Sequence, residues 1–125
     1  MIYEIGNEHL KVQVSTLGGE LMSVKKDGVE YLWQGNPEYW SGRAYNLFPI
    51  CGRLWEGKYT YRGDEYEMNL HGFVRKSELE LYAQTEDTIA FRLRPNEQTM
   101  KMYPFDFTYR VFYVLEGNTL KIRYR

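Results

Sequence analysis

Three side chains have the types and the spacing that acid–base chemistry on a small polar ligand needs. His71 lies in the segment NLHGFVR, directly before a glycine and four residues before Arg75, and Arg53 lies in the segment FPICGR. Histidine exchanges protons near neutral pH, and arginine offers a planar fork of N–H donors to carboxylates, phosphates or sugar hydroxyls. A lone histidine is more often a structural residue, and the seventeen acids of the chain could pair with either arginine. Both interpretations therefore stay open at this point.

Other kinds of site find little support in the sequence. Cys51 is the only cysteine, so no intramolecular disulfide forms, and it lacks the Cys/His cluster that zinc needs. We expect it to be a small buried hydrophobic residue. His9, the second histidine, lies in a turn and receives no role, and the segment STLGGE lacks the lysine and spacing of a phosphate-binding loop. The sequence predicts no metal and no cofactor.

Composition limits the class of protein. The 125 residues carry 16 Lys and Arg against 17 Asp and Glu, a net charge of −1, so no broad cationic face for nucleic acid or membrane is expected. No leader-like or membrane-spanning run is present, and with one cysteine we expect a cytoplasmic protein. Aromatic residues make up 17% of the chain, which fits either strands or a cleft that stacks on sugar rings.

Alternation of apolar and polar residues predicts the elements that position these side chains. Apolar residues occupy every second position in the ranges 10–14, 79–83, 89–93, 105–115 and 120–124. Turn residues separate the runs at 27–28, 62–64, 85–87 and 116–118. The pattern predicts an antiparallel, all-β chain with one buried face, forming one domain over residues 1–125. No long helix is expected, and at most one helical turn fits at 37–40.

Two segments depart from this regular pattern. Residues 36–57 are irregular and rich in Trp, Tyr, Arg and Gly, which indicates either a functional loop or a cover whose Trp40, Phe48 and Trp55 plug one end of the fold. The final residues NTLKIRYR stop within an alternating run. We therefore expect an unpaired edge strand and a chain that is the first part of a larger β-fold.

Three segments together resemble the aldose 1-epimerase, or mutarotase-like, family. YNLFPICGRLWEGKYTYRGDEYEMNLHGFVR is similar to its core signature, in the branch with F-P-x-x-G-R and H-G-F-x-R segments. YPFDFTYRVFYVLEGNTLKIRY and STLGGELMSVKKDGVEYLW are similar to its next strand signature and to its N-terminal hairpin. The resemblance covers nearly the whole chain, and it implies the N-terminal half of an antiparallel β-sandwich of the supersandwich type.

The resemblance also implies a reaction and a set of site residues. Family members interconvert the α and β anomers of a hexose by acid–base opening of the ring, without a cofactor. His71 matches the first histidine of the family site, while the usual general acid, a second histidine, and the usual base, a glutamate, lie in the C-terminal half of relatives. Arg53 and Arg75 match arginines that line the pocket and that bind phosphate in relatives acting on hexose 6-phosphates. The weaker candidates for substrate contact are Asn46, Phe48 and Phe73.

Three functions are therefore carried forward. The complete protein is an anomer-exchanging isomerase that acts on a sugar or sugar phosphate, and the 125-residue chain alone is inactive. Alternatively, the chain is a sugar-binding domain without catalysis, or a β-fragment that completes its sheet with another chain, for example as a homo-oligomer through exposed strand edges. No nucleic acid and no membrane is expected as a partner.

Overall fold

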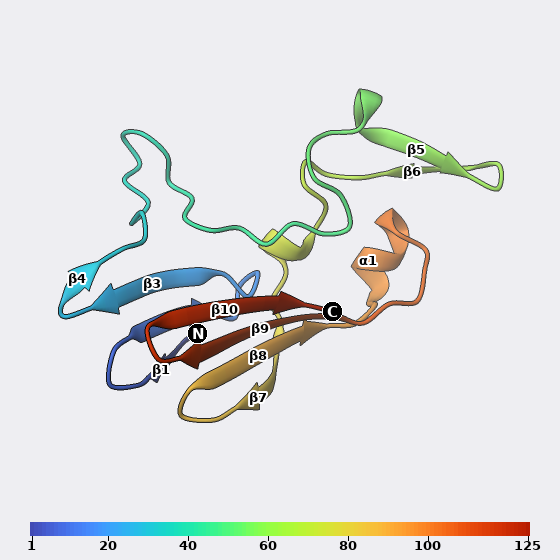
Figure 1. The fold of residues 1–125 in the computed structure, drawn as a ribbon. Coiled ribbons are helices and arrows are strands. Elements are labelled where there is room, and N and C mark those ends of the chain that lie inside the picture. Colours follow the sequence, from blue (N-terminus) through green and yellow to red (C-terminus); the bar gives the residue numbers. More distant parts are fainter.

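Two four-stranded antiparallel sheets face each other in the computed structural model, which describes all residues from 1 to 125 (Figure 1). The first sheet has the order β1 (Ile2–Gly6), β2 (Lys11–Ser15), β3 (Leu21–Lys26) and β4 (Val29–Glu30). The second has the order β10 (Thr119–Tyr124), β9 (Tyr109–Glu116), β8 (Thr88–Leu93) and β7 (Glu80–Gln84). The expected antiparallel β architecture is thus confirmed. Short turns or loops join neighbouring strands in each sheet, except β8 and β9, which are joined by the longer segment that contains the helix α1 (Glu97–Met102).

The elements outside the sandwich lie beside one of its ends. The hairpin of β5 (Lys58–Tyr61) and β6 (Asp64–Glu67) stands apart from the two sheets and close to α1 (Glu97–Met102), as Figure 1 shows. The Tyr59 hydroxyl donates to the Met102 carbonyl at 2.6 Å and so ties the hairpin to the helix. Two single turns, η1 (Trp55–Gly57) and η2 (Val74–Lys76), flank the hairpin along the chain. Neither the helix nor these turns are long or apolar enough to cross a membrane.

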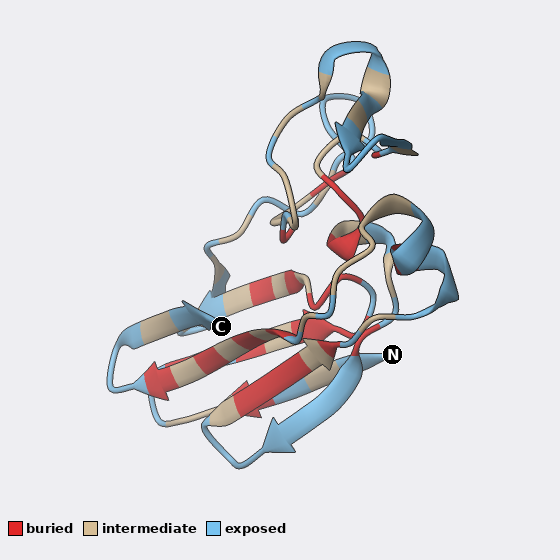
Figure 2. Ribbon diagram, turned by 90° about the vertical axis from the view of Figure 1, so that its right-hand side faces the viewer, coloured by how far each residue is buried: buried red, intermediate tan, exposed pale blue.

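The hydrophobic core lies between the two sheets, where the buried residues of Figure 2 gather. Inward positions of β2 and β9 alternate with outward ones, as the sequence predicted, and Val12 and Val111 are completely buried. In the central strand β8 the alternation is incomplete, because Ala90 is as fully buried as Phe91. Tyr3 of the first sheet and Phe91 of the second have ring centroids 5.9 Å apart. Backbone bonds from Gly6 N–H to Glu86 O and from Gly18 N–H to Ser77 O join the two layers outside the ladders.

The edge strands differ from the expectation of one buried face. Every residue of β7 is exposed, including Leu81, because β7 lies at the sheet edge and its register with β8 shifts between Leu81 and Ala83. At the opposite edge, β10 leaves Ile122 41% and Tyr124 58% exposed. The sandwich therefore has apolar side chains along both free edges of its second sheet. The predicted buried face is absent from β7 and incomplete on β10.

The buried tyrosines of β9 predict how stability depends on pH. Burial raises the pKa of Tyr113, although the Asn46 amide donates to its hydroxyl, and burial with the neighbouring Tyr124 and Tyr113 raises the pKa of Tyr109. An unfolded tyrosine ionises near pH 10 while these two stay neutral in the fold. Ionisation of these tyrosines thus favours the unfolded state. Their contribution to the free energy of unfolding is fully present below about pH 10. Above that pH the free energy of unfolding falls by about 1.4 kcal/mol per pH unit for each tyrosine.

Urea unfolding between pH 9 and pH 11.5 measures this loss. We expect Tyr113→Phe to show a shallower slope than the wild type, since one of the protons linked to unfolding is then absent. A wild-type slope that Tyr113→Phe leaves unchanged would contradict the assignment to this residue.

Candidate functional site

The structure places the FPICGR and HGFVR segments side by side, and both have irregular backbone. Phe48 and Gly72 form an isolated parallel bridge, and the Phe48 carbonyl accepts from the N–H groups of Phe73 at 2.9 Å and Val74 at 3.3 Å. The β5–β6 hairpin lies between these segments in the sequence, so closing it brings the two segments into contact. Residues 36–57 contain no strand, as expected, and they supply one side of this paired structure.

His71 is held by Gly52 through both its backbone and its ring. The His71 N–H donates to the Gly52 carbonyl, and the Gly52 N–H donates to Nδ1 of the His71 ring, each at 2.8 Å. His71 takes the left-handed conformation with φ +63°, which is uncommon outside glycine. Since Nδ1 accepts a hydrogen bond, the neutral ring carries its proton on Nε2. The half-buried ring makes no other hydrogen bond, so Nε2–H is a free donor on a fixed ring.

Neither predicted pocket arginine is neutralised by an acid. The four ion pairs of the protein are Lys58–Glu65, Arg92–Glu80, Arg94–Glu80 and Lys121–Glu116. Arg53 is exposed. Arg75 is half-buried, its guanidinium lies 5.4 Å from the centre of the Tyr45 ring, and its Nε is buried without a hydrogen-bond partner. The structural ion pair that the sequence left open is therefore absent at both positions, and both charges remain available.

Asn46, one of the weaker candidates, lies in the core. Asn46 is 3% exposed, and its Nδ2 donates to Gly18 O at 2.9 Å and to Gly19 O at 2.8 Å. Its Oδ1 accepts from the Tyr124 hydroxyl at 2.9 Å. The amide is thus fully used within the protein, which gives Asn46 a structural position.

Phe48 and Phe73 belong to an aromatic cluster. Their ring centroids are 6.0 Å apart, and both rings pack against Tyr103 and Phe107. Phe73 is only 3% exposed and so packs, whereas half-buried Phe48 lines an apolar cleft beside β10 with Tyr109 and others. Of the two rings, only Phe48 has a surface that a ligand could reach.

The aromatic and cysteine side chains of the 36–57 segment correct two expectations. Trp55 is 88% exposed and Trp40 51% exposed, so neither plugs an end of the sandwich, and only Phe48 packs into the core as that interpretation required. Cys51 is exposed, not buried. It directly precedes Gly52, the residue whose backbone bonds to His71. No group of three His, Cys, Asp or Glu side chains is placed to hold a metal.

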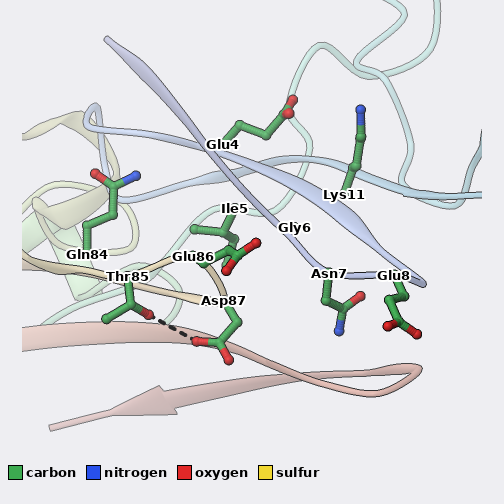
Figure 3. Close-up of a pocket in the computed structure, with 10 residues that line it drawn as sticks. All are labelled: Glu4, Ile5, Gly6, Asn7, Glu8, Lys11, Gln84, Thr85, Glu86 and Asp87. Carbon is green, nitrogen blue, oxygen red and sulfur yellow. Dashed lines mark hydrogen bonds between the residues drawn. The ribbon is translucent and has the colours of Figure 1, made fainter.

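The main surface cavities are formed by other elements. The largest, about 620 Å³, lies between the end of β1 and the β7–β8 turn (Figure 3). Four carboxylates line it, those of Glu4, Glu8, Glu86 and Asp87, with Lys11 as the single cation. Ligand sites are usually lined mostly by apolar side chains, and Ile5 is the only one here. None of the five main cavities is lined by His71, Arg53 or Arg75.

Comparison with known proteins agrees with this fold and identifies the family of the chain. The family model for aldose 1-epimerase matches residues 1–125. The plasmid-encoded protein LacX of Lactococcus lactis subsp. lactis is 44% identical over 100% of the chain and 44% of its own length. The chain thus spans less than half the length of this curated relative.

Two solved structures have the same arrangement of strands. A galactose mutarotase related enzyme from Lactobacillus acidophilus has a TM-score of 0.97 and 44% identity, covering 99% of this chain and 42% of that one. A galactose mutarotase-like protein from Lactobacillus casei has a TM-score of 0.95 and 29% identity, covering 99% and 43%. With the family model matching from the first residue to the last, the chain belongs to the aldose 1-epimerase family.

Proposed function

We propose that the complete protein interconverts the α and β anomers of a hexose or hexose 6-phosphate, and that this chain supplies part of the site. The observation that carries the proposal is the ring of His71, fixed by the Gly52 N–H at 2.8 Å with Nε2–H free to donate. A histidine held in this tautomer suits hydrogen bonding to a sugar oxygen. Family membership supplies the class of reaction.

The reaction needs an acid and a base acting together. A base removes the proton from the C1 hydroxyl, an acid protonates the ring oxygen, and the C1–O5 bond breaks to give the open aldehyde. Rotation about the C1–C2 bond and the reverse steps give the other anomer. His71 binds a sugar oxygen through Nε2–H and so favours charge displacement toward it. The only other histidine is His9, an exposed turn residue whose backbone N–H donates to Asn7 Oδ1. Following the family pattern, in which a second histidine is the acid and a glutamate of the C-terminal half is the base, we place the acid and base outside these 125 residues.

The two arginines support an anionic substrate within this proposal. Arg53 and Arg75 form none of the ion pairs of the protein, and forked cations suit a phosphate dianion. A hexose 6-phosphate would place its phosphate on arginine while His71 contacts the anomeric end. Neither a metal nor an organic cofactor is needed for this chemistry.

Anomer exchange measured by NMR tests the proposal. Glucose, galactose and glucose 6-phosphate are examined with the 125-residue chain and with the product of its complete reading frame. We expect the complete product to accelerate exchange, and the 125-residue chain to bind without accelerating it, with a ligand-dependent shift of the Gly52 amide signal. Binding without exchange in both would favour the sugar-binding domain, and neither binding nor exchange would contradict the proposal.

Replacing the two histidines separately gives a matched comparison. His71→Ala in the complete product is expected to lower the exchange rate about 100-fold, as the loss of a positioned hydrogen-bond donor does elsewhere. His9→Ala is expected to leave the rate unchanged, because His9 lies in the Asn7–Leu10 turn. Acceleration by the 125-residue chain alone that His71→Ala abolishes would show that acid and base lie within the chain, contrary to the proposal.

A further inference from the structure

A cation that is partly buried usually pairs with a carboxylate. Arg75 instead lies against an aromatic ring. Its Nε is buried without a hydrogen-bond partner, and no Asp or Glu forms an ion pair with it. The one group found against its guanidinium is the ring of Tyr45, at 5.4 Å from the ring centre. A ring face attracts a cation without neutralising it. The positive charge of Arg75 is therefore held in place yet left free for an anion.

The ring of Tyr45 is itself held by the ring of Trp40. The two rings meet edge to face, with centroids 5.8 Å apart and planes at 82°. Gly42 makes this contact possible, because a Cβ there would lie 2.5 Å from the Trp40 ring and 2.8 Å from the Tyr45 ring. The Trp33 indole N–H donates to the Trp40 carbonyl at 2.8 Å. The ring of Tyr45 thus has little freedom to move away from Arg75.

Both segments are anchored to the loop between β2 and β3. Glu20 accepts from the N–H groups of Arg43 at 3.2 Å and Ala44 at 3.0 Å, directly before Tyr45. Gly18 lies against the backbone of Arg75, where a Cβ would come within 3.0 Å of its Cα and its carbonyl oxygen. One loop therefore sets the positions of the ring and of the arginine backbone, and with them the direction of the guanidinium.

We infer that Tyr45 is a positioning residue for Arg75, the arginine to which the proposed function assigns the phosphate of a phosphorylated sugar. The phosphate role rests on the proposed function, whereas the positioning of Arg75 by Tyr45 rests on the contacts alone. Tyr45 acts through Arg75, so its hydroxyl is dispensable and its ring is required. Gly42 and Trp40 hold the ring of Tyr45 in place, and the ring of Tyr45 in turn holds the guanidinium of Arg75.

The test uses the 125-residue chain with 15N-labelled arginine side chains and three substitutions. Tyr45→Leu removes the ring, Tyr45→Phe keeps it, and Tyr66→Leu removes a ring from the β5–β6 hairpin, where Tyr66 stacks on Tyr59 at 5.3 Å. NMR follows the Arg75 Nε–H signal, and titration with inorganic phosphate and glucose 6-phosphate gives dissociation constants. We expect Tyr45→Leu to move the Nε–H signal, speed its exchange with water and weaken phosphate binding about twofold to fivefold. Tyr45→Phe and Tyr66→Leu should leave all three unchanged.

The two readouts separate this inference from the proposed function. An Arg75 Nε–H signal that keeps its position and exchange rate in Tyr45→Leu would overturn the positioning role, whatever the ligand. Phosphate binding that is equal in wild type and Tyr45→Leu would overturn the link to anion affinity while leaving anomer exchange intact. Absence of phosphate binding by the wild type would overturn phosphate as the ligand of Arg75, and the Nε–H signal would still decide the role of Tyr45.

Discussion

Replacing Gly72 with alanine is expected to lower the free energy of unfolding by about 2–5 kcal/mol, the sum of left-handed strain and of overpacking against fixed backbone. Gly72 has φ +75°, and a Cβ there would lie 2.1 Å from the Phe48 oxygen, 2.4 Å from its carbonyl carbon and 2.7 Å from Pro49 N. These are backbone atoms, so no rotamer change can relieve the contact. A loss of this size is a large part of the ordinary stability of a domain, about 5–15 kcal/mol.

Gly63→Ala is the matched control for this substitution. Gly63 has φ +85° in the β5–β6 turn, and no atom lies within 4 Å of the position its Cβ would take. It therefore measures left-handed strain alone, about 1–2 kcal/mol. Urea unfolding of both variants gives the comparison. Equal losses would mean that the Phe48–Gly72 bridge yields easily, and the rigid support we assign to His71 would have to be abandoned.

About half of the strands, and the turns between them, were predictable because their causes are local. Period-two alternation placed β2, β8, β9 and β10, and the Asp27-Gly28 and Arg62-Gly63 turns take positive φ at both residues. The helix α1 was missed because six residues show no helical period. Its evidence was a capping box, in which the Asn96 side chain accepts from Thr99 N–H and the Thr99 side chain accepts from Asn96 N–H. That pattern is readable in a sequence but brief.

Longer-range effects account for the other differences. Phe105 and Phe107 continue the alternation of β9, yet β9 begins only at Tyr109. Tertiary contacts override the alternating pattern here. The ring centroids of Phe107 and Phe48 are 5.4 Å apart, and those of Phe105 and Tyr61 are 4.9 Å apart. These aromatic contacts join segments more than forty residues apart, which no local pattern reports.

The candidate site shows the same division between local motif and distant contact. The motifs identified His71, Arg53 and Arg75, whose catalytic and binding roles remain predictions. They did not show that Gly52 would fix the ring of His71, or that Tyr45, thirty residues earlier, would hold Arg75. Both partners are adjacent only because the β5–β6 hairpin and the β2–β3 loop fold these segments together. Glycine at 42 and 72 allows these close contacts, and the presence of glycine at these positions was the available sign in the sequence.

Asn46 is the residue for which a structural and a ligand-binding role predict opposite results. Asn46→Ala removes the donors to Gly18 O and Gly19 O and the acceptor of the Tyr124 hydroxyl. Buried groups left without partners cost about 1–3 kcal/mol each. The Tyr113 hydroxyl still donates to Gly19 O at 2.7 Å and Tyr124 is half-exposed, so the Gly18 carbonyl is the buried group left unpaired, and we expect a loss of about 1–3 kcal/mol. The loss should appear in urea unfolding without any ligand.

Asn69→Ala provides the comparison for an asparagine outside the core. Asn69 is exposed, and its amide has only the Met102 sulfur as a partner, at 3.7 Å. Its replacement should change stability by less than about 0.5 kcal/mol. Sugar titration of both variants then separates the two roles of Asn46. If Asn46→Ala unfolds as wild type does but loses affinity for the sugar, the amide serves the ligand and its four protein contacts are incidental. If stability falls and the folded fraction still binds, Asn46 serves the site only by holding the β2–β3 loop, the same loop that places Tyr45 and Arg75.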